Sequence, residues 1–174
     1  MFERIKLLNA LFYTANENAV ANLLVKNKKT LAIAESCTGG LISSLMTDVS
    51  GSSAFIKSNF VTYANEAKTK YLNVSPKTLE QFGAVSAQTA EEMVNGLLNE
   101  TGCDYAVATT GIAGPTGGTK EKPVGLVYIG VGTKDKCTIV KYNVNPKCSR
   151  ILIKYHFAKQ AIKVLYNYIK DNEK

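Results

Sequence analysis

The stretch Ala34-Glu35-Ser36-Cys37-Thr38-Gly39-Gly40 joins a short apolar run, Thr30-Leu31-Ala32-Ile33, to a helix-like pattern. The apolar run predicts a buried strand. After the turn, apolar residues recur at helical spacing, at Leu41, Ile42, Leu45, Met46 and Val49. A strand that enters a helix through a turn of this kind presents hydroxyl oxygens and backbone N–H groups together. Those N–H groups attract a phosphate or a developing oxyanion, so the stretch predicts an active site.

The length and composition of the chain are typical of a globular protein. It has 174 residues, of which 45% are hydrophobic, and this predicts one domain with a sizeable core. No apolar run is long enough to span a membrane, and the opening Met1-Phe2-Glu3-Arg4 does not resemble a signal peptide. The cysteines form no C-x-x-C pair. We therefore expect a cytoplasmic protein with free thiols, no metal, no cofactor and no membrane partner.

The chain is basic, with a formal net charge of +7, but only Arg4 and Arg150 supply a guanidinium group. Nucleic-acid-binding surfaces usually combine arginine with aromatic side chains. Dispersed lysines favour a solvated surface first and attraction of an anionic small molecule second. Specific nucleic-acid binding is not expected.

The apolar patterns predict a single α/β domain over residues 1–174, a layered sandwich with a mixed sheet flanked by helices. It comprises an N-terminal helical segment (1–29), a core (30–143) and a C-terminal helix (149–170). Within the core we expect a helix over 39–49, a helix from an Asn65 cap to Leu72, and helices bounded by Ser75-Pro76 and Gly83 and by Ser86 and Gly102. Strands are expected over 30–33, 60–63, 105–109, 124–131 and 137–142, and the last two form a hairpin.

Three segments should meet at one edge of this sheet, because ligands of open α/β folds bind beyond the carboxyl ends of the strands. They are the Ser36 turn, residues 63–68 and residues 110–118. The glycine-rich loop 111–123 matches neither a Walker A nor a G-x-G-x-x-G pattern. Its glycines would let the backbone approach a ligand and donate N–H bonds, and its thirteen residues favour a function over an ordinary connection.

Ser36 is the first candidate nucleophile, and it needs a neighbouring base. The only histidine, His156, lies within the C-terminal helix, so a Ser-His-Asp triad is disfavoured. Lys68 is the attractive base, because a helix N-terminus and burial both lower a lysine pKa. The alternatives are a solvated Lys68, Glu35 as the base, and Cys37 as a nucleophile activated by the helix N-terminus.

At these residues the chain resembles the carboxy-terminal domain family of competence/damage-inducible protein CinA, whose stand-alone members are nicotinamide-nucleotide amidohydrolases. The resemblance spans roughly residues 30–132. It rests on the 34–40 stretch together with Gly51-Ser52-Ser53-Ala54-Phe55, Phe60-Val61-Thr62-Tyr63, Asn65-Glu66-Ala67-Lys68, Gly83-Ala84-Val85-Ser86, Thr110-Gly111-Ile112-Ala113-Gly114-Pro115, Gly117-Gly118 and Glu121-Lys122-Pro123-Val124-Gly125.

The resemblance implies hydrolysis of the carboxamide of nicotinamide mononucleotide to nicotinic acid mononucleotide and ammonia, in pyridine-nucleotide salvage. It implies a serine–lysine arrangement, Ser36 with Lys68, and a proton-relaying or orienting role for Tyr63. Arg150 would bind the phosphate, although Asn145-Pro146-Lys147-Cys148-Ser149 departs from the glycine-containing acidic turn usual in the family. The other expected substrate-binding residues are Thr38, Gly39, Gly40, Asn65, Thr110, Gly111 and Gly114.

Two other functions are weighed beside this one. The chain could be a nucleotide-binding module without turnover, or a DNA-associated factor linked to competence or damage. The expected partner is a pyridine nucleotide, and apolar helices at both ends favour a homo-oligomer, most simply a dimer.

Overall fold

The computed structural model describes residues 15–173. Five strands form one mixed sheet in the order β2-β1-β3-β4-β5. The strands β1 (Leu31–Glu35), β2 (Ile56–Val61) and β3 (Tyr105–Gly111) are parallel, and β4 (Leu126–Gly132) and β5 (Cys137–Asn143) continue the sheet as an antiparallel hairpin. The prediction of an α/β domain with a mixed sheet and a late hairpin is confirmed.

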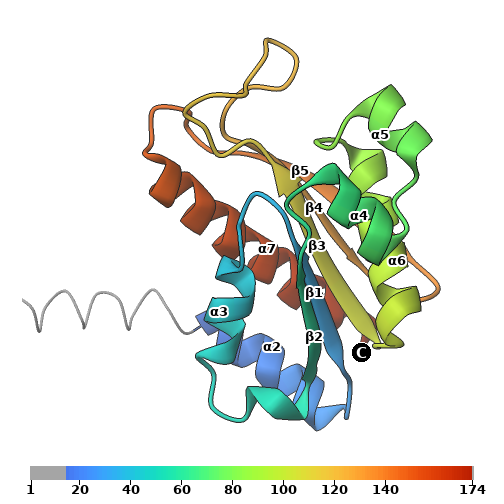
Figure 1. Ribbon diagram of the computed structural model, residues 1–174. Coiled ribbons are helices and arrows are strands. Elements are labelled where there is room, and N and C mark those ends of the chain that lie inside the picture. The colour runs from blue at the N-terminus through green and yellow to red at the C-terminus, as the bar shows by residue number, and fades with distance from the viewer. Residues whose placement is uncertain (1–14, 174) are drawn as a thin grey trace, which may run out of the picture.

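Helices cover both faces of the sheet (Figure 1). On one face, α2 (Ala15–Lys26), α3 (Leu41–Thr47) and α7 (Arg150–Asn172) enclose the larger apolar core. On the other face, α6 (Ala87–Thr101) packs on the strands, and α4 (Asn65–Leu72) and α5 (Pro76–Phe82) pack on α6. A single 3-10 turn, Ser52–Ala54, precedes β2. Within residues 15–173 no helix is long and apolar enough to cross a lipid bilayer.

Element boundaries follow local backbone chemistry. Ser86 caps α6 by accepting a hydrogen bond from Thr89 N, and Gly83 and Gly102 end α5 and α6 at positive φ, as predicted. The predicted start of α3 at Gly39 is wrong, because Gly39 and Gly40 adopt φ values of 64° and 95° and the helix begins at Leu41.

Two further boundary predictions are corrected. Ala64, in extended backbone, is the N-cap of α4, so Asn65 is the first helical residue and not the cap. Strand β2 ends at Val61, so Tyr63 lies in the connection to α4 and not in a strand. Of the predicted N-terminal helical segment 1–29, residues 1–14 lie outside the described residues, and residues 15–26 are helical.

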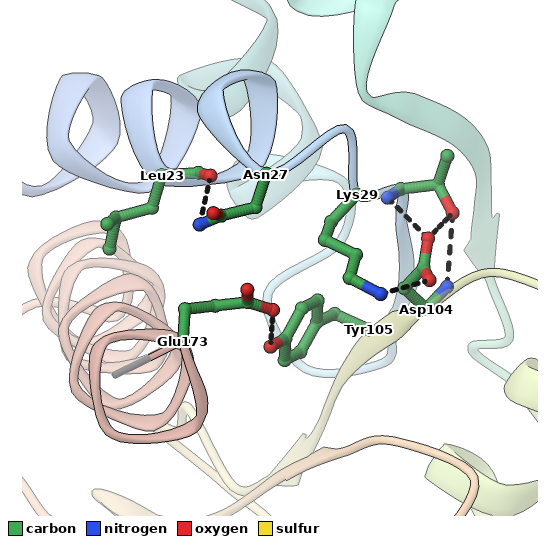
Figure 2. A network of polar contacts seen from close by, with 7 residues as sticks. Leu23, Asn27, Lys29, Asp104, Tyr105 and Glu173 are labelled. Atoms are coloured by element: carbon green, nitrogen blue, oxygen red, sulfur yellow. Dashed lines mark hydrogen bonds and ion pairs between the residues drawn. The ribbon is translucent and has the colours of Figure 1, made fainter.

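A polar network closes the end of the sheet where β1 and β3 begin (Figure 2). The Asp104 carboxylate accepts hydrogen bonds from Thr30 N at 2.9 Å and Thr30 Oγ1 at 2.7 Å, and it pairs with Lys29 Nζ at 3.1 Å. Tyr105 of β3 donates its hydroxyl to Glu173, just past the end of α7. These contacts fix the ends of β1, β3 and α7 on the side of the sheet away from the Ser36 turn.

Candidate active site

A crevice of about 350 Å³ opens at the carboxyl ends of the parallel strands, as the sequence predicts. The β1–α3 turn, the β2–α4 connection, the loop after β3 and the start of α7 all contribute to it. Its lining residues are Ser36, Cys37, Tyr63, Lys68, Ala84, Val85, Thr110, Gly111, Ile112, Ala113, Gly114, Thr116, Gly117 and Arg150.

Lys68 and Ser36 form the chemical centre of this crevice. Lys68 Nζ donates a hydrogen bond to Ser36 Oγ over 3.1 Å, although the two residues come from different elements. The same nitrogen contacts two backbone carbonyls, Thr62 O at 2.8 Å and Tyr63 O at 3.3 Å. Lys68 is only 1% exposed, and Ser36 is 8% exposed. The predicted juxtaposition of amine and hydroxyl is therefore present.

The electrostatic state of Lys68 follows from its burial. Loss of hydration penalises the ammonium form and lowers the pKa of Lys68 below its ordinary value, while the nearby Cys37 and Glu66 act in the opposite direction. The ammonium form donates to all three oxygens. The neutral amine keeps two N–H bonds for the two carbonyls, and its lone pair then faces the Ser36 hydroxyl in place of the third N–H. Such an amine has the properties of a general base.

Glu35 is not placed to act as the base. Its buried carboxylate accepts hydrogen bonds from the backbone N–H groups of Gly40, Ile42 and Ser43 at 3.0, 3.1 and 2.8 Å, and from Ser43 Oγ at 2.7 Å. It therefore occupies the N-terminus of α3 itself. The structure thus corrects the expectation that these α3 donors face a ligand.

Cys37 lines the crevice but lacks the properties of an activated thiol. Burial raises the pKa of Cys37 to about 12, which outweighs the lowering effects of Lys68 and Arg150. The structure therefore opposes the alternative in which a helix N-terminus activates this thiol. Ser36, in hydrogen-bond contact with an amine, is the better nucleophile.

Arg150 bridges two sides of the crevice mouth. Its Nη1 donates to Gly114 O over 2.6 Å, and its Nη2 donates to the hydroxyl of Tyr63 over 3.0 Å. The Tyr63 side chain is 61% exposed and points to Arg150, so Tyr63 contacts Lys68 through its backbone carbonyl and not through its phenol.

The other predicted binding residues divide into two groups. Thr110, Gly111 and Gly114 line the crevice, and Thr110 Oγ1 donates to Ala84 O over 2.6 Å. Thr38, Gly39, Gly40 and Asn65 do not line it. Thr38 is buried against Thr109, and Gly40 N is bonded to Glu35. Asn65 borders a more open hollow of about 520 Å³ between α4 and α5, whose lining holds no paired nucleophile and base.

The search for reactive residues in the sequence did not identify the apolar residues that line the crevice. Ala84, Val85, Ile112 and Ala113 form walls of the crevice, and their side chains carry no reactive group that would have marked them. The nearest signal was the position of these residues inside the quoted motifs. His156 is exposed on α7 and does not line the crevice.

Comparisons with known proteins agree with this architecture. The family model for the CinA C-terminal domain matches residues 13–169. A CinA-like protein of Endomicrobium trichonymphae is 54% identical over 126 residues, which are 72% of this chain and 29% of that protein. A CinA-like protein of Chlorobium limicola is 41% identical over 161 residues, which are 91% of this chain and 38% of that protein. The chain thus spans about a third of the length of these relatives.

Solved structures of CinA proteins share this fold. The competence/damage inducible protein CihA of Agrobacterium tumefaciens is 37% identical with a TM-score of 0.82, and the match covers 89% of this chain and 96% of that one. A CinA superfamily protein of Klebsiella pneumoniae is 28% identical with a TM-score of 0.85, over 90% of this chain and 96% of that one.

Proposed function

Since the chain belongs to the CinA C-terminal domain family, we propose that its crevice hydrolyses the carboxamide of nicotinamide mononucleotide. The products are nicotinic acid mononucleotide and ammonia, and the reaction serves pyridine-nucleotide salvage. The observation that carries the proposal is the buried Lys68 amine within 3.1 Å of the Ser36 hydroxyl. Pure nucleotide binding needs no such pair, because phosphate and base recognition use neither a neutral amine nor a nucleophile.

The first half of the reaction forms an ester. Ser36 Oγ attacks the carboxamide carbon while Lys68 Nζ takes the hydroxyl proton, and the carbonyl oxygen becomes an oxyanion. The C–N bond then breaks, and the Lys68 ammonium gives its proton to the departing nitrogen. Ammonia leaves, and the nicotinoyl group remains joined to Ser36. The contacts of Lys68 with Thr62 O and Tyr63 O keep its nitrogen aimed at Ser36 in both steps.

The second half restores the enzyme. Water attacks the ester carbon, Lys68 accepts a proton from that water, and the same proton returns to Ser36 as the ester bond breaks. The product is released as the carboxylic acid, which loses its proton to the solvent, with the ribose phosphate unchanged. Each proton that Lys68 takes up is given back, so the cycle needs no other reactant than water.

Backbone amides of the glycine-rich loop are the best donors for the oxyanion. Gly39 N and Gly40 N already have acceptors, Ser36 O and Glu35 Oε2, so they are not free for this role. Ala113 and Gly114 line the crevice and are buried, and their N–H groups have no acceptor among the described residues. Preorganised donors of this kind stabilise the charge that develops in acyl transfer.

Arg150 supports recognition of a phosphorylated substrate. It lines the crevice mouth, and its hydrogen bonds to Gly114 and Tyr63 leave further guanidinium N–H groups for an anion. Lys68 is the other basic residue that lines the crevice, and in this mechanism its amine serves proton transfer.

Ammonia release tests the proposal. The purified chain is incubated with nicotinamide mononucleotide, and ammonia and the carboxylate product are measured together. We expect turnover by the native chain and its loss in Ser36→Ala and in Lys68→Ala, with binding of the nucleotide preserved in Ser36→Ala. Binding without ammonia release by the native chain would favour the nucleotide-binding module instead. A steep salt-dependent affinity for duplex DNA would favour the DNA-associated factor.

We also propose a cytoplasmic homodimer. The four cysteines are free thiols, which supports a reducing compartment. Apolar side chains are exposed at Val61, the last residue of β2, and at Ile151, which follows Arg150 and is 80% exposed. Light scattering of the purified chain should give twice its mass of 18.8 kDa, and a monomeric mass at micromolar concentration would contradict the dimer.

A further inference from the structure

The glycine-rich loop spans residues 112–125 and not 111–123, because β3 extends to Gly111 and β4 begins at Leu126. It is attached to its surroundings through two cations, one at each side. On the side of α7, Arg150 donates to Gly114 O. On the side of α5, Lys122 of the loop itself reaches outward, and its Nζ donates to Phe82 O over 2.5 Å. The loop is therefore held between α7 and the α5–α6 connection.

The α5–α6 connection is itself a wall of the crevice, because Ala84 and Val85 line it. Three consecutive carbonyls, of the last residue of α5 and the first two residues of this connection, are each held by a different part of the fold. Phe82 O accepts from Lys122, Gly83 O accepts from the hydroxyls of Ser86 and Thr89 on α6, and Ala84 O accepts from Thr110 of β3. Of these bonds, the one made by Lys122 joins the wall to the glycine-rich loop.

A lysine at position 122 suits the C-terminus of α5, where it donates its hydrogen bond. Phe82 is the last residue of α5, so its carbonyl has no partner within the helix, and a cation at a helix C-terminus is favourable. Gly83 adopts a φ of 75°, and a Cβ at this residue would lie 3.2 Å from Lys122 Nζ. Glycine thus provides both the turn and the space for the ammonium group.

The loop transmits the position of Lys122 because it is braced internally. Thr119 holds the backbone of Lys122 on both sides, with Lys122 N donating to Thr119 Oγ1 at 3.0 Å and Thr119 N donating to Lys122 O at 2.8 Å. Gly114 and Gly118 pack so closely on Val124 that a Cβ on either would lie within 2.7 Å of it. A displacement of Lys122 is therefore expected to move Gly114 and the crevice-lining part of the loop as well.

We propose that Lys122 is a positioning residue that sets the width of the crevice between the glycine-rich loop and the Ala84–Val85 wall. The ligand itself is taken from the proposed function, on which this inference rests. The flat pyridine ring of that ligand would be held between the loop and the Ala84–Val85 wall. Lys122 touches neither the reacting carbon nor Lys68. It acts by holding the surfaces that bind the ring.

Amide hydrogen exchange tests the attachment without reference to any reaction. Lys122→Met keeps the apolar stem and removes the donors, Lys122→Arg keeps the charge, and Lys120→Ala changes an exposed neighbouring lysine as a control. We expect exchange in peptides that contain the hydrogen-bonded amides of Gly83, Thr119 and Lys122 to rise about tenfold in Lys122→Met, as loss of a charge-assisted hydrogen bond predicts. Lys122→Arg should restore much of the protection, and Lys120→Ala should match the native chain. Native exchange rates in Lys122→Met would overturn the proposal.

Steady-state kinetics with nicotinamide mononucleotide separate positioning from chemistry. In Lys122→Met we expect KM to rise about tenfold while kcat changes less than about twofold, because binding surfaces move and the Ser36–Lys68 pair does not. An unchanged KM, or an equal fall in kcat, would overturn the role assigned to Lys122. If the native chain releases no ammonia, the proposed function fails, and the exchange measurement alone decides whether Lys122 joins the two walls.

Discussion

Gly96 of α6 packs directly on the carbonyl oxygen of Leu72 at the end of α4, so closely that a Cβ on Gly96 would lie 1.7 Å from that oxygen. The close approach holds α4, which carries Lys68, against α6. A glycine in mid-helix costs some helical stability, which this contact offsets.

Gly96→Ala should therefore destabilise the protein and displace α4, which carries Lys68. We expect a loss of about 3 kcal/mol or more in the free energy of unfolding, at the upper end of overpacking effects. Asn95→Ala, on the exposed face of the same helix, is the matched control. Denaturant titration measures both variants, and equal stability for the two would contradict the close contact.

Glu35→Gln should weaken the start of α3. The amide can accept on one atom only and turns N–H bonds toward N–H groups of the helix, so about 1–3 kcal/mol should be lost for the donors left unsatisfied. Because Ser36 follows Glu35, turnover should fall as well. Glu80→Gln, which changes an exposed carboxylate of α5, should leave stability unchanged. A Glu35→Gln protein as stable as the native chain would refute the capping role.

Cys37→Ala should retain hydrolysis within about threefold, because the thiol is buried and its pKa is raised to about 12. The same properties predict that iodoacetamide at pH 8 modifies Cys37 in the native chain far more slowly than in the unfolded chain. Mass spectrometry of alkylated peptides measures this ratio. Loss of turnover in Cys37→Ala, or rapid alkylation of native Cys37, would return this residue to the nucleophile role.

Lys68 should impose a distinctive pH dependence on stability. Burial lowers the pKa of Lys68 in the folded state, so the unfolded chain binds the proton more tightly. The free energy of unfolding should therefore rise with pH between the lowered value and 10.5, the ordinary value. Lys68→Met should flatten this rise and be more stable than the native chain at the acidic end. Parallel pH profiles for the two proteins would show that Lys68 titrates normally.

Lys68 should also govern the pH dependence of turnover. The neutral amine is the active form, so kcat/KM should increase with pH and reach a plateau below the pH expected for an unperturbed lysine. Lys68→Arg, which cannot lose its proton at these pH values, should be inactive throughout. A profile that rises only near 10.5 would contradict a lowered pKa.

Arg150→Lys should raise KM for nicotinamide mononucleotide about tenfold, because an ammonium group cannot reproduce the fork that bonds Gly114 O and Tyr63 OH together. Tyr63→Phe removes one of these two bonds and should have a smaller effect, with kcat preserved in both variants. A fall in kcat with unchanged KM would place the Tyr63 phenol or Arg150 in the chemical step instead.

Local patterns in the sequence were sufficient for much of the fold. Apolar spacing located the strands and helices, Ser86 marked the start of α6, and Gly83 and Gly102 marked helix ends, because capping depends on residues within one or two turns. The convergence of the Ser36 turn, the segment around Lys68 and the glycine-rich loop also followed from the sequence, since all three succeed parallel strands.

The tertiary structure alone decided what each polar group does. Glu35 and Lys68 are both ionisable residues near the Ser36 turn. In the folded chain the Glu35 carboxylate caps the N-terminus of α3, whereas the Lys68 amine contacts the Ser36 hydroxyl. Burial raises the pKa of Cys37, whereas its position before α3 had suggested a lowered pKa. Arg150 and Lys122 donate to carbonyl groups 36 and 40 residues away in the sequence. Helix caps and periodicity are encoded by near neighbours, whereas burial and bonding depend on which distant segments the sheet order brings into contact.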